Sequence, residues 1–336
     1  MNLASRRLSV LILISYALLA APFRANGQSC QISSEMDDAT RKPIAAAGRR
    51  FFDLAAKGDV ASMRQGAIPS LAGAFGNAET LVKAHQADFA GAQASVKSVF
   101  LLDAAGNAPL PRAQFYCGVF GKNGQTPGSA EFDFENLPPG KYAVALLDVT
   151  SPKARTNFSV ILQQAGADWK LGDLYIETAA IGGHDSDWFA ARAREYKAKG
   201  QTHNAWLFMV EARTLVSPIP IMSTLATDKL YDEAKAILPG DFPAEGKTAD
   251  LAAGTLTYKL TSVFPQTIGS DLDLVVRYQS ADVSNTNKTY ETNVAVMKAL
   301  VTKYPELRDT FAGMVARAVD PNGRDYGTLL AMKDIK

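Results

Sequence analysis

The side chains that most often carry out chemistry are scarce in this 336-residue chain, which has 2 cysteines and 3 histidines. A zinc site needs about three or four converging ligands, and His85 and His203 each stand alone in the sequence. The run His184–Asp187 looks like a metal loop, but a hard cation takes about six or more oxygens, and the following residues do not supply them. We therefore expect no metal and no cofactor, and we expect this run to begin a helix, capped by Ser186 or Asp187.

Nucleophilic catalysis also lacks its usual sequence patterns. There is no Gly-x-Ser-x-Gly elbow and no phosphate-binding loop that ends in Gly-Lys-Ser or Gly-Lys-Thr. Cys117 lies in the apolar run Phe115–Val119, where a reactive thiolate is disfavoured. We interpret Cys30 and Cys117 as a disulfide pair, and the alternative is two buried free thiols.

One carboxyl group, that of Asp148, is a candidate for acid–base catalysis. On a strand, the Asp148 side chain would point to the same face as Tyr142, Val144 and Leu146. It would therefore stand at the mouth of any apolar cavity that those residues face. Desolvation there would favour the protonated acid. The alternative, which we favour, is that Asp148 begins a solvated turn that ends at Pro152.

Three aromatic residues are predicted to line a ligand pocket. They are Tyr116, Tyr142 and Trp169, all on predicted strands. Aromatic side chains on strands also serve as ordinary core residues, so this prediction depends on a cavity being present.

The first residues predict export. Arg6 and Arg7 precede the apolar run Leu8–Ala21, and small residues follow, so residues 1–27 read as a signal peptide cleaved after Gly27. Export to the periplasm or the cell exterior would permit the disulfide, and no transmembrane segment would be left after cleavage. The alternative is a lipid anchor on Cys30, although Gly27-Gln28-Ser29 fits a lipobox poorly.

Composition argues against a nucleic-acid partner. The chain has 35 Lys and Arg against 34 Asp and Glu, which gives a net charge of +1. Phosphate binding calls for a basic surface, and none is indicated. The 47% hydrophobic content is enough for a buried core.

Periodicity divides the remainder into a linker (28–43), a first α+β domain (44–180), a helical segment (181–246) and a small α+β domain (247–336). Helical spacing predicts a helix over 38–57, a short one through Met63, and a third from Pro69 that breaks near Gly76. Alternation then predicts antiparallel strands from Val96 to Ile176, so helices should cover one face of a curved sheet.

The segment from about Ile44 to Ile176 resembles the NTF2-like (cystatin-like) superfamily. The resemblance is carried by the element order and by the closing run Asp168–Ile176, which looks like the final strand of many small secreted members. It implies a cone-shaped sheet with an apolar pocket between the sheet and the helices, and it implies no particular reaction.

The helical segment predicts helices over 188–199, 202–216 and 227–237. The spacing of Ala193, Tyr196, Ala205, Met209 and Ala212, followed by a proline, resembles one tetratricopeptide-like hairpin. A solenoid needs about three repeats, so the hairpin must pack on a neighbour, most simply the preceding sheet. The final domain reads as ββαββ. The whole arrangement resembles a family of exported bacterial proteins, which adds no mechanism.

These features predict an exported, non-catalytic binding or scaffold protein with an apolar pocket, and its partner would be a small apolar ligand or another protein. The alternative is a cofactor-independent NTF2-like pocket enzyme of isomerase, dehydratase or hydrolase type that acts on a small apolar substrate. It requires at least two titratable groups that converge in the cavity. A purely structural protein is expected if side chains fill the cavity.

Overall fold

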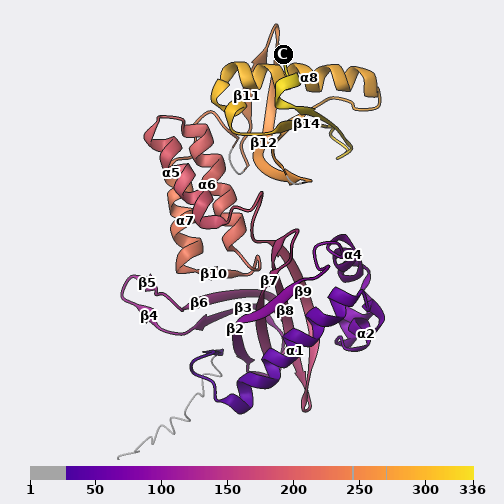
Figure 1. Ribbon diagram of the computed structural model, residues 1–336, viewed down its shortest axis with the longest axis vertical. Helices are drawn as coiled ribbons and strands as arrows, with labels where there is room; N and C mark the ends of the chain where they lie inside the picture. Colours follow the sequence, from indigo (N-terminus) through magenta and orange to yellow (C-terminus); the bar gives the residue numbers. More distant parts are fainter. Residues whose placement is uncertain (1–27, 244–245, 270) are drawn as a thin grey trace, which may run out of the picture.

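The computed structural model describes residues 28–243, 246–269 and 271–336, which form two units, each built around a five-stranded sheet (Figure 1). The predicted signal peptide, residues 1–27, lies outside the described residues. The α+β class is confirmed, and the strands pair antiparallel except for the pair β13–β14. No helix in the described part of the chain has both the length and the apolar character needed to cross a membrane.

The first unit begins with the predicted helices. Helix α1 (Asp38–Lys57) starts where the Asp37 side chain accepts the Thr40 amide, and it ends at Gly58, whose φ of 69° suits glycine. The apolar stripe of α1 is buried against the sheet, with Ile44 and Phe51 fully inside. The third predicted helix is broken near Gly76 as expected, so three short helices follow, namely α2 (Val60–Gln65), α3 (Pro69–Gly73) and α4 (Gly76–Ala84).

The main sheet of this unit has the order β1-β2-β7-β8-β9. Its strands are β1 (Ser29–Ile32), β2 (Gln93–Ala104), β7 (Gly140–Thr150), β8 (Arg155–Ala165) and β9 (Asp168–Thr178). Strand β1 and the first turns of α1 occupy residues 28–43, which we expected to be a linker. The expectation was wrong because β1 forms by pairing with β2, which lies far away in the sequence.

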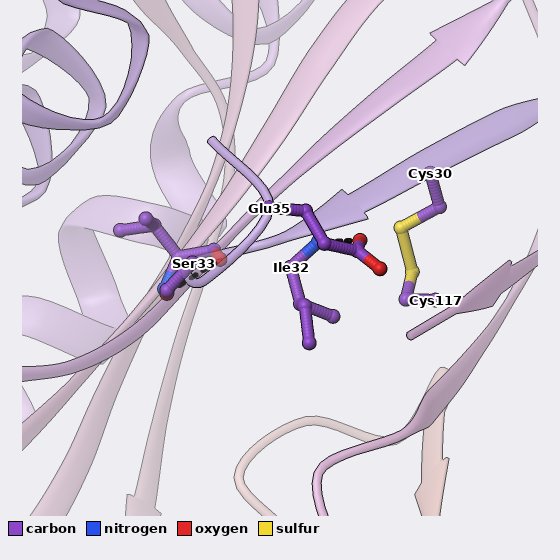
Figure 2. The surroundings of a disulfide bond; sticks show 6 residues. Cys30, Ile32, Ser33, Glu35 and Cys117 are labelled. Carbon is purple, nitrogen blue, oxygen red and sulfur yellow. Dashed lines mark hydrogen bonds between the residues drawn. A yellow bond between two sulfur atoms is a disulfide. The ribbon is translucent and has the colours of Figure 1, made fainter. Parts of the chain in front are cut away.

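The predicted disulfide between Cys30 and Cys117 is present (Figure 2). It joins β1 to β3 (Leu110–Cys117) across 87 residues of sequence, with the two Cα atoms 4.9 Å apart. Close to it, the Ile32 amide donates to Glu35, and Ser33 exchanges hydrogen bonds with the backbone of Val99 in β2 (Figure 2). The start of the described chain is therefore held on the sheet by covalent and polar contacts.

A second, smaller sheet covers the face of the main sheet that the helices leave open. It consists of β3, β6 (Ala130–Leu137) and β10 (Met222–Thr224), in the order β10-β6-β3. The short strands β4 (Phe120–Gly121) and β5 (Gly124–Gln125) form a hairpin beside it. The main sheet thus has two cores, one toward the helices and one toward the second sheet.

Strand β7 shows this double burial most clearly. Ala145 and Leu147 belong to the helix-side core, whereas Val144 and Leu146 belong to the core under the second sheet. Tyr142 was predicted to line a pocket, and Asp148 was placed at its mouth on the condition that Val144 and Leu146 face it too. In the structure β3 and β6 cover this face, and the side chains of Tyr142, Val144 and Leu146 are buried in the core beneath the second sheet.

The helical segment comprises α5 (Ser186–Ala198), α6 (Thr202–Val216) and α7 (Leu225–Ala236). The cap of α5 is Asp185, which accepts the Trp188 amide at 3.2 Å, and not Ser186 or Asp187. These helices share one core with the last domain, where the Phe208 ring lies 6.1 Å from that of Phe311. The hairpin therefore packs on the following domain, and the predicted domains 181–246 and 247–336 form one C-terminal unit.

The C-terminal sheet contains one strand more than we predicted. Its order is β11-β12-β13-β14-β15, with strands β11 (Ala249–Ala253), β12 (Leu256–Ile268), β13 (Asp271–Gln279), β14 (Gly313–Val319) and β15 (Asp325–Ala331). Helix α8 (Thr286–Lys303) connects β13 to β14, which makes that pair parallel, and covers one face of the sheet. The turns η1 (Pro305–Asp309) and η2 (Met332–Asp334) complete the unit.

Candidate functional site

The space between the main sheet and its helices is filled by aromatic side chains. The Phe52 ring lies 5.6 Å from that of Phe89 and 5.4 Å from that of Phe158, with edge-to-face geometry in both pairs. All three side chains are buried. The apolar hollow expected at this place is therefore occupied by the core itself.

The three aromatic residues predicted to line a pocket do not meet. Tyr116 is 55% exposed and packs its ring against Phe120. Tyr142 is buried under the second sheet, where its hydroxyl donates to the Pro138 carbonyl at 2.9 Å, and Trp169 is buried on the helix side. This prediction was wrong because the strands that carry the three residues present them to three different environments.

Asp148 lies at the surface and not in a cavity. Its carboxyl stands 3.3 Å from the ammonium of Lys97, and the side chains of both residues are half exposed. The exposure agrees with the solvated alternative, but Asp148 lies within β7 and does not begin a turn. Water screens such a pair, so the geometry offers no desolvated acid at this position.

A groove lies instead where the two units meet. Its central cavity has a volume of about 510 Å³ and lies between the end of β9, the connection that includes β10, and the facing sides of α6 and α7. Its lining combines carboxylates, hydroxyls, one guanidinium and one phenol, and consists of Glu177, Val210, Arg213, Thr214, Ser217, Pro220, Met222, Ser223, Thr227, Asp228 and Tyr231.

Two adjoining cavities extend this centre in both directions. One, of about 700 Å³, lies along β6 and shares Pro220, Met222 and Ser223 with the centre. The other, of about 220 Å³, lies between α6 and α7 and shares Val210, Arg213 and Tyr231. We call the three together the junction groove. Its outer parts add Arg112, Glu131, Asp133, Glu135 and Ile221 at one end and Trp206, Ala234, Lys235, Leu238 and Pro243 at the other.

The connection between α6 and α7 positions the groove. Pro218 and Pro220 prevent α6 from continuing, and Ile219 between them is fully buried in the core of the first unit. The Pro218 carbonyl accepts from Ser159, and the Ile221 carbonyl accepts the Asp133 amide at 3.0 Å. Residues of the second unit are thereby held on the sheets of the first. This docking also explains why local sequence patterns did not reveal the site.

The electrostatics of the groove centre on Arg213. Its guanidinium carbon lies 4.7 Å from the centre of the Tyr231 ring, and no carboxylate of the described residues forms an ion pair with it. Burial raises the pKa of the Glu177 carboxyl, and burial together with the nearby Asp232 charge raises that of Asp228. The groove thus contains a guanidinium group and two carboxyls that ionise less readily than usual.

Asp228 is held in place by Gln125 from the β4–β5 hairpin. The Gln125 amide nitrogen donates to the Asp228 carboxylate at 2.8 Å and to the Ser223 hydroxyl at 2.7 Å. The amide oxygen of Gln125 is buried without a partner among the described residues. A side chain of the first unit therefore orients two groups that line the cavity.

The described lining residues include no histidine and no cysteine. The groove can therefore offer hydrogen bonds, an aromatic face and opposite charges, but not the usual pairing of a nucleophile with an imidazole base. Its open and elongated form suits an extended chain better than a compact apolar molecule, for which proteins use enclosed apolar cavities.

His203 has partners that the sequence did not reveal. Its Nδ1 lies 3.0 Å from Glu306 and its Nε2 lies 2.9 Å from Asp241, whose other oxygen accepts from the Tyr304 hydroxyl. The carboxylates stand on opposite sides of the ring, so they cannot share one metal ion with it. Within the described chain, no group of three or more His, Cys, Asp or Glu side chains is arranged for a metal.

Comparison with family models, with curated proteins and with solved structures finds no match to this chain. The candidate site therefore rests on the geometry of the junction groove.

Proposed function

We propose that the protein is an exported, non-catalytic binding protein and that its junction groove holds an extended segment of a partner protein. We further propose an NTF2-like (cystatin-like) fold for the first unit and a tetratricopeptide-like hairpin for α5 and α6. Export is supported by the disulfide, which persists in oxidising compartments, and by the basic and apolar start of the sequence. A nucleic-acid partner is not favoured, because basic and acidic residues are balanced.

The observation that carries this proposal is the continuity of the groove past β10. This strand pairs with β6 on one side only and forms the edge of the second sheet. Both Met222 and Ser223 of β10 line the groove. The outward amides of β10 already donate within the chain, Met222 to the Ile219 carbonyl and Thr224 to the Thr227 hydroxyl, so an extended peptide would be held mainly by the side chains that line the groove.

The lining also favours a polypeptide over a small apolar ligand. Arg213, stacked on Tyr231, is placed to pair with an acidic side chain, and the Ser and Thr hydroxyls can bond to peptide groups. The acidic end of the groove, which contains Glu131 and Glu135, would accept a basic side chain. We therefore expect a segment that carries both charges.

Binding can be tested with peptides from a random display library, selected for binding to the chain from residue 28 onward. We expect the Arg213→Glu and Tyr231→Ala variants to weaken the selected peptides by about tenfold or more, because each removes a central contact. Arg277→Glu is a matched control, since Arg277 also stacks on an aromatic ring, at 5.5 Å from Phe264, but lies outside the groove.

Hydrogen exchange locates the bound peptide on the same samples. Slower exchange of amides in β10 and α7 would support the proposal. Peptides that bind both groove variants as tightly as the unchanged chain, or that protect only other elements, would contradict it.

One observation favours the alternative, a cofactor-independent enzyme of isomerase, dehydratase or hydrolase type. Glu177 and Asp228 line one cavity, and burial raises the pKa of both, as a general acid near neutral pH requires. This function would be established if turnover of a small apolar substrate were lost in Glu177→Gln and in Asp228→Asn but kept in the surface variant Asp148→Asn. Equal turnover in all three variants would exclude these two residues from catalysis.

A further inference from the structure

Strand β15 leaves one side of its backbone without a partner strand. Among the described strands it forms the end of the C-terminal sheet and pairs with β14 alone. The Asp320 amide bonds to the Arg324 carbonyl and the Met332 amide to the Ala312 carbonyl at the two ends of this pairing. Bonded pairs alternate along an antiparallel ladder, so residues 326, 328 and 330 bond to β14. The backbone groups of residues 325, 327, 329 and 331 then point away from the sheet.

The other edges of the five-stranded sheets are protected. Strand β1 has only four residues and is tied by the disulfide, and β9 is interrupted by a register shift and bonded through Leu171 to the loop before α3. At the other end of the C-terminal sheet, β11 is short and carries the ion pair Asp250–Lys259. Such devices keep strand edges from pairing with other chains.

Strand β15 has one such device, the ion pair of its first residue Asp325 with Arg317 of β14, and none beyond that residue. It runs for seven residues in unbroken register with β14, and residues 326–331 include no charge and no proline. Leu329 is 51% exposed and extends a row of apolar side chains through Val315 and Val275 to Phe264 in the neighbouring strands. An uncharged edge of this length is a template for another strand.

We propose that β15 pairs antiparallel with β15 of a second copy of this chain, about a two-fold axis at Thr328. This register places residue 327 opposite residue 329 of the other copy, and 325 opposite 331, so the backbone groups that face outward meet one another. The two five-stranded sheets become one continuous sheet across the dimer.

The strand is self-complementary in this register. Leu329 of each copy stands opposite Gly327 of the other, where no side chain competes for the space. Asp325 of each copy stands opposite Ala331 of the other, so like charges do not meet across the paired strands. The contact uses the same surface twice and closes on itself, which limits assembly to a dimer.

Sedimentation velocity on the chain from residue 28, over a wide range of concentrations, tests the proposal. We expect a concentration-dependent dimer that Leu329→Pro weakens by about tenfold or more, because this change removes an outward amide that β14 does not use. Leu329→Lys should have the same effect through its charge, and it keeps the test valid if the proline variant fails to fold. Leu256→Lys, at a leucine that is 59% exposed on β12, is the matched control and should dimerise normally.

Hydrogen exchange of the β15 segment should slow as the concentration rises, and not in the Leu329 variants. A chain that stays monomeric throughout, a dimer that survives both Leu329 changes, or a dimer lost equally in Leu256→Lys would overturn the proposal. A foreign peptide that adds to β15 of a monomeric chain would also overturn it. Arg213→Glu should leave dimerisation unchanged. A failure of the groove proposal can therefore be distinguished from a failure of the dimer proposal.

Discussion

The two units cover their five-stranded sheets differently. Each has a five-stranded sheet with a long helix across one face, α1 in the first unit and α8 in the second. In the first unit the opposite face is covered by the second sheet, and β7 and β8 are buried over six or seven consecutive residues. In the second unit the opposite face carries Arg277 and Arg317, and the edge strand β15 is open.

The two sheets differ in how many of their faces other elements cover, and this difference decides which parts of each sheet a partner can reach. A sheet enclosed on both faces can present only its loops and its junctions, and the candidate groove lies at such a junction. A sheet enclosed on one face keeps its other face and its edge available for a partner.

Removal of the disulfide should affect only the enclosed unit. The double change Cys30→Ala and Cys117→Ala frees a loop of 87 residues, and the chain-entropy model gives a loss of about 4 kcal/mol in unfolding free energy. Denaturant-dependent hydrogen exchange, followed separately in β7–β8 and in β13–β14, measures the two units. Equal destabilisation of both would show that they do not unfold separately.

The second unit should lose stability as the pH rises. Burial raises the pKa of Glu211 on α6 from 4.5 to about 7, and the described residues supply no ion pair to this side chain. Because the folded pKa lies above the unfolded one, the stability is full below pH 4.5 and is lost progressively up to about pH 7. The whole loss is about 3 kcal/mol.

Chemical denaturation across this pH range measures the effect. The variant Glu211→Gln should abolish most of the slope, while Glu291→Gln, at an exposed position of α8, should keep it. A slope that persists unchanged in Glu211→Gln would assign the pH dependence to other groups.

The attachment of α8 to its sheet should depend on a buried polar network. Asn293 accepts from the Tyr278 hydroxyl at 2.7 Å and donates to Thr328 of β15 at 2.9 Å. We expect Asn293→Ala to cost about 2 kcal/mol, because the buried hydroxyl of Tyr278 loses its partner. Thermal unfolding compared with Asn287→Ala, at an exposed position of α8, checks this. Near-equal stability of the two variants would mean that the apolar contacts of α8 suffice.

The surface pair on the first unit should contribute least. Asp148→Asn removes the contact with Lys97 between two half-exposed side chains, so the change in stability should be below about 0.5 kcal/mol. Denaturation at low and high salt measures it. A larger effect would mean that Asp148 has a role that its exposed position does not explain.

Local patterns in the sequence predicted the elements well. The bounds of α1 and α6 agree with the structure, because capping residues and the apolar stripe are properties of neighbouring residues. The two cysteines sufficed to predict the disulfide. Strand β11 was missed because its sequence, Ala-Asp-Leu-Ala-Ala, has no β-branched or aromatic residue, and it depends on pairing with β12.

The site was not predictable from such patterns. Parity along β7 correctly grouped Tyr142 with Val144 and Leu146, but it contains no information about which layer covers that face. The junction groove combines Glu177, Arg213 and Tyr231, residues that no local period connects. His203 looked isolated because its partners Asp241 and Glu306 lie 38 and 103 residues away.

The helices, most strands, the disulfide pair and the mixed α+β class follow from the order of the residues, because each depends on short-range spacing or on a single possible pairing. Long-range packing is needed to show that the hairpin joins the second unit, that a second sheet closes the first, and that a groove lies between them. These outcomes depend on which apolar surfaces bury each other, and many surfaces of similar composition compete for that burial.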